Sequence, residues 1–344
     1  MTYTGGVDST IANLARRVEA GDDLSRDQLL TLTERGPQHP EELLYWSGRI
    51  REARFGRCVK LCSIVPGKLG GCAEDCKWCA QSLAWPAGAS CAASGKSNRT
   101  PKGRIVDAAR SAWRNGVANI GIVNSGRRPS RRDIDAVVEA AGAIRGDPEC
   151  GIDLCASLGQ VTRDQADGLA AAGFRRYHHN LETSRRFFPT MVTTHAYDDR
   201  LRALAAARSA GLEVCCGGIF GLGESWEDRV DLALALRDVV KPVAVPLNFL
   251  HPIPGTPLEN ALPMPPMEIL SIIALFRLAM PSADIKIAGG REVNLRDLQS
   301  WVFQAGATSL MVGDYLTTTG RAVADDLRML ADLGLNPVKA WPGE

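Results

Sequence analysis

The sequence lacks the long apolar runs, the charged leader and the charge excess that mark several classes of protein. No stretch of its 344 residues approaches the roughly 18 consecutive apolar residues of a membrane span. The N-terminus has no charged region followed by an apolar one, so we expect no secretory signal and a cytoplasmic location. Lys and Arg number 40 against 39 Asp and Glu, and this net charge of +1 gives no global attraction to nucleic acid or to an anionic membrane.

Cysteine is scarce but unevenly placed. Ten cysteines are roughly 3% of the chain, far below a disulfide scaffold, and we expect a reducing compartment. Buried structural thiols usually scatter as small hydrophobic residues. Cys72, Cys76 and Cys79 instead fall within eight residues of one another, in a stretch that also carries glycine and charge. This clustering indicates a metal or cluster site.

From about residue 56 onward, short apolar runs alternate with amphipathic segments. The apolar runs predict eight strands, at 59–65, 117–123, 152–157, 175–180, 213–219, 244–250, 285–289 and 309–313. The segments between and after them predict helices at 104–115, 131–145, 163–172, 198–210, 226–239, 266–280, 295–305 and 325–333. This repeat predicts an α/β fold, a (β/α)8 TIM-type barrel, which we prefer to a doubly wound sheet because the count is eight and notable residues recur at strand ends.

Three regions follow from this reading. Residues 1–55 are expected to form an N-terminal helical extension with two helices, near 24–34 and 41–54. Residues 56–337 would form the barrel, and 338–344 a C-terminal tail. Within the barrel, the stretch 84–98 is rich in Ala, Ser and Gly and predicts a flexible loop.

The cysteine spacing C-x3-C-x2-C favours an iron–sulfur cluster over zinc. Thiolates are preferred ligands of both, but structural zinc normally takes four ligands, often as two distant C-x2-C pairs. Cys72, Cys76 and Cys79 have no matching second pair. Three thiolates on a [4Fe–4S] cube leave one iron open, which can chelate the amino and carboxylate groups of a methionine moiety. A three-ligand zinc site and three unconnected thiols remain the alternatives.

The loop resembles the signature of radical S-adenosylmethionine (SAM) enzymes, and later segments extend the resemblance to the biotin synthases. Those segments occur in the family's order, at 60–64, 71–82, 179–184, 217–224, 246–250, 255–258, 289–294 and 313–319. The resemblance implies a radical SAM sulfurtransferase that inserts sulfur into dethiobiotin by means of a 5′-deoxyadenosyl radical. It also implies an electron donor such as flavodoxin or ferredoxin, and a homodimer.

The resemblance assigns several residues to SAM. Trp78 matches a position that lies along the adenine, and Gly221 belongs to a Gly-rich turn after the fifth strand. Glu182 stands where the family usually has Asp or Asn on the ribose, and its carboxylate can accept two hydroxyl protons. Asn180 lies beside this site, and the segment 123–126 is expected to hold the methionyl amino group through its backbone.

Other matches point to the substrate. Asn180 and Asn248 match asparagines that contact the ureido ring of dethiobiotin, and an amide offers the donor and the acceptor that a urea needs. Thr317 and Thr318 match the region that meets the substrate's carboxylate tail. His178 departs from the family, which usually has Asn there; the change either retunes the polarity of the pocket or marks a changed substrate.

Biotin synthases also carry an auxiliary [2Fe–2S] cluster inside the barrel, and here the match is incomplete. Cys155, Cys215 and Arg291 match three of its ligands, but Gly121 stands in place of the second-strand cysteine. Another group, such as Cys216, can substitute; an exogenous ligand such as sulfide can complete the set; or the auxiliary cluster is absent. Because neighbouring strand residues face opposite sides, Cys216 should point away if Cys215 points inward.

The remaining cysteines are interpreted as structural: Cys58, Cys62, Cys91 and Cys150. Gly121 and His178 also keep an alternative open, a diverged radical SAM enzyme that acts on another small molecule without inserting sulfur. A non-enzymatic iron–sulfur carrier is disfavoured, because a carrier needs no barrel pocket lined with ordered polar groups.

Overall fold

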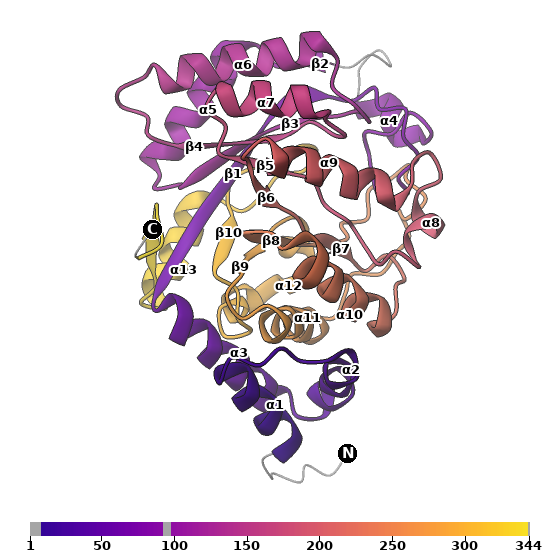
Figure 1. The fold of residues 1–344 in the computed structure, drawn as a ribbon, viewed down its shortest axis with the longest axis vertical. Helices are drawn as coiled ribbons and strands as arrows, with labels where there is room; N and C mark the ends of the chain where they lie inside the picture. Colours follow the sequence, from indigo (N-terminus) through magenta and orange to yellow (C-terminus); the bar gives the residue numbers. More distant parts are fainter. Residues whose placement is uncertain (1–7, 92–97, 343–344) are drawn as a thin grey trace.

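A closed ring of parallel strands forms the centre of the molecule (Figure 1). The structure is a computed structural model that describes residues 8–91 and 98–342. In spatial order the ring contains β1 (Cys58–Leu69), β3 (Asn119–Asn124), β4 (Asp153–Ser157), β5 (Arg176–His178), β6 (Glu213–Cys215), β8 (Ala244–Phe249), β9 (Asp284–Ile287) and β10 (Ser309–Met311). The ring closes where β10 pairs with β1, with Cys62 opposite Met311. The predicted TIM-type barrel is confirmed.

The fifth predicted strand is interrupted. It divides into β6 and the short β7 (Gly218–Phe220), and both pair with β8. The break lies at Gly217, where a Cβ atom would stand 1.9 Å from the carbonyl oxygen of Pro246. Only glycine permits that approach, so the chain crosses here without a side chain.

Helices cover the outside of the ring. They are α5 (Lys102–Arg114), α6 (Arg131–Arg145), α7 (Arg163–Ala171), α8 (Phe188–Met191), α9 (Tyr197–Ser209), α10 (Trp226–Leu234), α11 (Pro266–Ala279) and α13 (Val323–Asp332). Ser130, Thr162 and Ser225 begin three of them with capping boxes, which satisfy the first free N–H groups. The helix expected at 295–305 is instead a short α12 (Arg291–Leu295) followed by the 3-10 turn η3 (Arg296–Val302).

The N-terminal extension contains three α-helices where two were expected. They are α1 (Ser9–Glu19), α2 (Arg26–Arg35) and α3 (Pro40–Phe55), and a short 3-10 turn, η1 (Gly36–Gln38), precedes α3. The missed helix, α1, begins at Asp8, whose carboxylate accepts the N–H groups of Thr10 and Ile11. The extension lies at one end of the molecule, where α3 packs on α11 and α2 on α10 (Figure 1).

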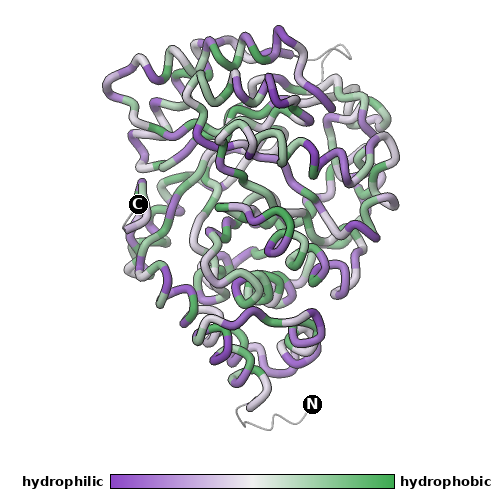
Figure 2. The backbone as a smooth tube through the Cα atoms, in the orientation of Figure 1, coloured by the Kyte–Doolittle hydropathy of each residue, from purple (hydrophilic) through white to green (hydrophobic). Residues whose placement is uncertain are grey.

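This covering changes the environment of α11. All residues from Ile269 to Ala279 are buried, because the barrel lies on one side and the N-terminal helices on the other. Figure 2 shows α11 as a largely hydrophobic coil, whereas helices at the surface carry both colours. A helix that is apolar on all sides is what such a sandwiched position requires.

The segment expected to be a flexible loop is partly ordered. It forms α4 (Pro86–Cys91), and β2 (Asn98–Arg99) pairs antiparallel with the end of β1. Positions 92–97 lie outside the described residues. Near the C-terminus, β11 (Asn336–Val338) adds a parallel strand beside the start of β1.

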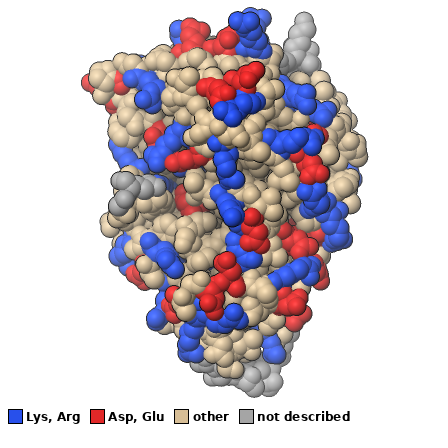
Figure 3. Space-filling model, viewed as in Figure 1, with Lys and Arg blue, Asp and Glu red and all other residues tan. Residues whose placement is uncertain are grey.

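The surface carries mixed charge. Figure 3 shows basic and acidic side chains interspersed over the face in view. Over residues 8–91 and 98–342, no helix has both the length and the apolarity that crossing a bilayer requires.

Arg277, near the end of α11, links two connections, the one between α11 and β9 and the one between η3 and β10. Its buried guanidinium donates to the carbonyl groups of Gly306, Pro281 and Ala283, each at 2.9 Å.

We expect Arg277→Met to lower the free energy of unfolding by about 2–4 kcal/mol, because these carbonyls would lose their partner. Urea unfolding would measure it. Arg328→Met, at a side chain 71% exposed, should change it little, and equal effects would contradict the assignment.

Candidate active site

A cavity of about 330 Å³ opens at the carboxyl ends of the barrel strands. Ten of the residues singled out in the sequence lie on its wall: Trp78, Cys79, Cys155, His178, Asn180, Glu182, Cys215, Asn248, Thr317 and Thr318. Four others are not part of that wall: Cys72, Cys76, Gly221 and Arg291. This is the face on which TIM barrels carry their active sites.

The cysteine loop leaves β1 through two glycines and closes on itself. Gly70 and Gly71 adopt φ values of +68° and +65°, a conformation that side chains disfavour. Cys72 then holds the two sides of the loop together, since its N–H donates to the carbonyl of Gln81 at 3.2 Å and its carbonyl accepts from Leu83 at 2.8 Å. These two hydrogen bonds give the loop a defined shape.

The three loop thiols lie close to one another. Burial raises the pKa of Cys76, Arg200 opposes this, and the nearby Cys79 and Cys72 raise it further, so the three sulfurs lie within electrostatic reach of one another. Cys thiolates are the ligands that hold [4Fe–4S] clusters, and these three come from one short loop.

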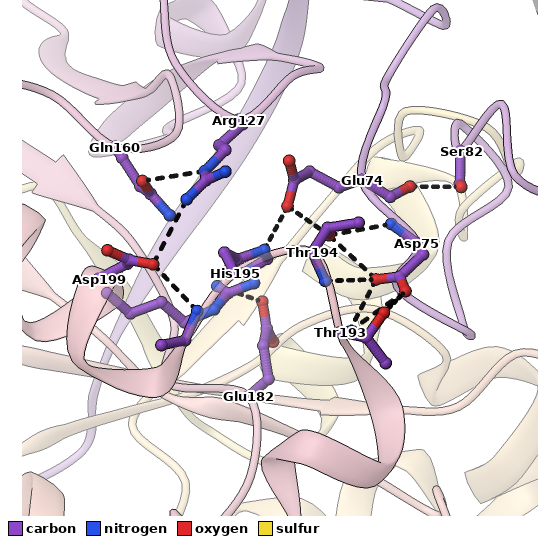
Figure 4. A network of polar contacts seen from close by, with 12 residues as sticks. Glu74, Asp75, Ser82, Arg127, Gln160, Glu182, Thr193, Thr194, His195 and Asp199 are labelled. Atoms are coloured by element: carbon purple, nitrogen blue, oxygen red, sulfur yellow. Dashed lines mark hydrogen bonds and ion pairs between the residues drawn. The ribbon is translucent and has the colours of Figure 1, made fainter.

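The acidic pair between the cysteines anchors the loop to the segment after α8 (Figure 4). Asp75 accepts the N–H groups of Thr193 at 2.9 Å and Thr194 at 3.2 Å, and also the Thr193 hydroxyl. Glu74 is 8% exposed and contacts the Nδ1 atom of His195 and the Thr194 hydroxyl. Sequence reasoning missed this clamp, although two carboxylates inside a cysteine loop were a visible signal.

The clamp shifts the pKa values of its members. Burial alone would raise the pKa of Asp75, but hydrogen bonds from Thr193 and Thr194 outweigh burial and lower it to about 2. Burial and Arg200 lower the pKa of His195, against the pull of Glu74. The carboxylate of Asp75 is therefore charged throughout the neutral range.

Glu182 faces the cavity from a left-handed backbone position, with φ at +72°. Its carbonyl accepts the N–H of Ile219 at 2.8 Å, and it lies so close to Gly218 that a Cβ there would stand 2.5 Å from that oxygen. Arg200 pairs with its carboxylate at 3.2 Å and also donates to the carbonyl of Asn180 at 2.9 Å. Arg200 thus orients Glu182, the one carboxylate of residues 8–91 and 98–342 that faces the cavity.

Two asparagine amides are fixed on the wall. Asn180 accepts the N–H of Gly217 at 3.0 Å and donates to Glu182 at 3.2 Å. Asn248 accepts the N–H of Gly289 and donates to the carbonyl of Gly218, both at 3.0 Å. Each side-chain amide has two N–H groups and two oxygen lone pairs. Each therefore keeps one N–H group and one lone pair for a ligand.

Gly221 lies behind the cavity wall, where it takes part in a hydrogen-bonded turn. Its N–H donates to the carboxylate of Glu224 at 3.1 Å, and Glu224 pairs with Arg229 at 2.9 Å. Its φ of +88° and the Met264 side chain, 3.0 Å from where a Cβ would lie, explain the glycine. The neighbouring cavity residue is Ile219.

The prediction that Arg291 points into the barrel is wrong. Gly290, with φ at +80°, turns the chain after β9, and Arg291 then begins α12. Its fully buried guanidinium pairs with Asp326 of α13 and donates to Gln299 at 3.0 Å. The inward cation of this strand is Lys286, which lines the cavity and is 3% exposed. Asp284 and Lys286 lie on one face of β9 and Ile285 and Ile287 on the other, as the alternation of strand residues requires.

The structure also shows where Cys216 and Cys62 lie. Cys216 belongs to the hydrophobic core behind the wall, as the alternation with Cys215 predicted. Cys62 had been interpreted as structural, yet it lies on the cavity wall together with Cys155 and Cys215. Burial raises the pKa of Cys155 to about 12 and also raises that of Cys215, so both thiols are protonated at neutral pH without a bound metal.

His178 lies directly beside one of these thiols. Its Nδ1 atom is 3.4 Å from the sulfur of Cys215. Burial lowers the pKa of His178 to about 4, so the imidazole is neutral at pH 7 and can serve as donor or acceptor.

The clamp on the cysteine loop can be tested by pH. Asp75→Asn should lower the free energy of unfolding at pH 7 by about 1–2 kcal/mol, because an amide replaces a charged acceptor of several hydrogen bonds. The pKa of Asp75 is about 2 in the folded chain against 3.8 for an ordinary aspartate, so its contribution is complete above about pH 4 and lost as the pH falls through 2. Urea unfolding of the cluster-free chain between pH 7 and 2 measures both effects.

The matched control is Asp107→Asn, at a side chain 75% exposed on α5. It should change stability by less than about 0.5 kcal/mol. If Asp75→Asn kept the full acid dependence of the parent, the carboxylate would not be the group responsible.

Two family models match the chain. The model of the Radical SAM superfamily matches residues 68–236, from the end of β1 through the cysteine loop to α10. The model of the Biotin and Thiamin Synthesis associated domain matches residues 246–336, from β8 to β11. The two matches together include most of the cavity wall.

Curated relatives are similar over nearly the whole length. The chain is 44% identical over 337 residues to the biotin synthase of Nitratidesulfovibrio vulgaris strain Hildenborough, covering 96% of this chain and 89% of that protein. It is 45% identical over 329 residues to the biotin synthase of Trichlorobacter lovleyi, covering 95% and 96%.

Solved structures share the fold at low identity. A methylornithine synthase superimposes with a TM-score of 0.79 at 20% identity, covering 94% of this chain and 97% of that one. The [FeFe]-hydrogenase maturase HydG gives a TM-score of 0.80 at 15% identity, covering 98% and 77%. These likenesses concern the fold alone.

Proposed function

The chain belongs to the biotin synthase family of radical SAM enzymes, and on that premise we propose that it inserts sulfur into dethiobiotin to form biotin. One observation carries the proposal: the fixed amides of Asn180 and Asn248 and the thiols of Cys155 and Cys215 face one cavity below the three-cysteine loop. Amides recognise a urea, and thiols hold a sulfur source, so the cavity combines the two requirements of this reaction.

Cys72, Cys76 and Cys79 would hold the [4Fe–4S] cluster. Together with SAM, that cluster supplies a carbon radical able to remove hydrogen from an unactivated carbon. Glu182, oriented by Arg200, offers a carboxylate that can accept two ribose hydroxyl groups.

The chain's own part is to position the substrate and exclude water. One free N–H and one free lone pair on each of Asn180 and Asn248 match the donors and acceptor of the ureido ring. Thr317 and Thr318, on the loop after β10, line the cavity, and their hydroxyl groups would bind the carboxylate tail. Apolar residues complete the wall and keep water from the reacting carbons: Ile64, Val123, Ile219, Phe249 and Leu250.

The proposed partners are an electron donor and a second copy of this chain. Each SAM cleavage needs one electron from outside the chain, so we propose a small electron-transfer protein such as flavodoxin or ferredoxin. A homodimer and a cytoplasmic location remain predictions.

Anaerobically reconstituted protein should convert dethiobiotin to biotin with SAM and a reductant, and should release methionine and 5′-deoxyadenosine. Mass spectrometry of the products measures this. SAM cleavage that consumed dethiobiotin without forming biotin would favour the alternative enzyme that does not insert sulfur.

The cluster assignment makes a sharper prediction. Cys72→Ala, Cys76→Ala and Cys79→Ala should each abolish reductive SAM cleavage, because each removes one of only three protein ligands. Chromatography of 5′-deoxyadenosine measures the rate. Cys150→Ala, a buried thiol away from the cavity, should cleave SAM at close to the parent rate. Normal cleavage by Cys76→Ala would show that the loop holds no such cluster.

The substrate assignment is tested at one amide. Asn180→Ala should weaken dethiobiotin binding by about 1–3 kcal/mol, because the urea would lose a partner in a buried site. Anaerobic calorimetry with SAM present measures the affinity. Asn260→Ala, at an exposed position, is the matched control. Unchanged affinity in Asn180→Ala would remove this residue from the substrate site.

A further inference from the structure

Three thiols and one ammonium group meet in the barrel interior. Cys62 of β1, Cys155 of β4 and Cys215 of β6 all line the cavity, and each is less than 8% exposed. The side chain of Lys286 lies among them, close enough that charge on Cys62 and on Cys215 would raise its pKa. Charge on Cys62 and Cys215 likewise influences Cys155, so the three thiols of this cavity wall lie within electrostatic reach of one another.

Gly121 has no side chain, so β3 contributes no thiol to this cavity. It pairs with Cys155 on one side and with Ile64 on the other. A Cβ at Gly121 would lie 3.3 Å from the Ile64 side chain and 3.9 Å from the Cβ of Cys155, so a side chain there would point into the same space. Cys62 precedes Ile64 by two residues and therefore faces the same side of the same strand.

We propose that Cys62 replaces the ligand that Gly121 cannot provide, so that Cys62, Cys155 and Cys215 hold a second iron–sulfur cluster inside the barrel. Among the described thiols outside the cysteine loop, none competes for this place. Cys216 packs in the hydrophobic core, and neither Cys58 nor Cys150 lies on the cavity wall. The ligand set stands on this geometry; only the use of the cluster as sulfur source rests on the proposed function.

Charge supports the assignment. A cluster on three thiolates is anionic, and a buried anion needs a cation nearby. Lys286 provides one at the cavity wall, and Arg176, 7% exposed on β5, lies within electrostatic reach of both Cys155 and Cys215. His178, with its Nδ1 atom 3.4 Å from the Cys215 sulfur, is the nitrogen donor closest to that thiol among the contacts of the described residues.

The experiment separates the second cluster from the first. In a background carrying Cys72→Ala, Cys76→Ala and Cys79→Ala, only the barrel interior can retain iron. After anaerobic reconstitution with iron and sulfide, iron, sulfide and the Mössbauer spectrum are measured per chain. We expect the background to retain iron and acid-labile sulfide, and the further change Cys62→Ala to lower both at least fivefold. Cys150→Ala in the same background should lower neither.

A second variant restores the site. Adding Gly121→Cys to the Cys62→Ala chain should recover most of the iron, because the new thiol points into the same space and only Ile64 must shift by a few tenths of an ångström. If Cys62→Ala fails to fold, judged by circular dichroism, the nearly isosteric Cys62→Ser takes its place with the same expectation.

Three results would overturn the proposal: no iron in the background, full iron retention without the Cys62 thiol, or equal loss in the Cys150→Ala control. None of these readouts uses turnover. Biotin formation by the parent protein tests the proposed function separately, so the two can fail independently.

Discussion

Closure of the sheet is the constraint on which the site depends. Pairing of β10 with β1 removes both edges of the sheet, and every second residue of each strand then faces one enclosed space. The register of the strands determines which residues are neighbours. Gly121 lies between Ile64 and Cys155, and Cys215 pairs with His178. Residues more than 150 positions apart therefore share one wall, which no local interaction could arrange.

The loop that would carry the first cluster is held by a different principle. It projects beyond the strands, so hydrogen bonds from side chains replace sheet pairing. Asp75 and Glu74 bind the segment after α8, and Arg200 of α9 orients Glu182 a short distance away. The cysteine loop and the carboxylate assigned to SAM are thus both anchored to the connection between β5 and α9, and a shift of that connection would move them together.

The sequence determines the fold here more fully than the site. Short apolar runs and the start and stop signals of helices were enough to predict eight strands and a barrel, because each βα unit carries its own local signals. The helix at 295–305 failed because Arg296, at φ +51°, breaks it, and nothing local marks an arginine for that conformation. Arg291 was misplaced because motif matching ignored Gly290, whose turn carries the chain out of the barrel. Cys62 was overlooked because its partners are distant strands, known only once the ring closes.

The positive charge of the buried Lys286 side chain must be compensated inside the barrel. Burying an ammonium group is costly unless negative charge compensates it. Asp284, two residues earlier on the same face of β9, contributes part of that charge, but its carboxylate already accepts the Thr308 hydroxyl at 2.9 Å. The thiols of Cys155 and Cys215 are protonated in the metal-free chain, because burial raises the pKa of both, and so they add no charge then. On the proposed ligand set, binding iron would displace those protons and turn the thiols into anions beside Lys286. Because Lys286 is buried on the same cavity wall, its ammonium group would compensate the charge of such a cluster.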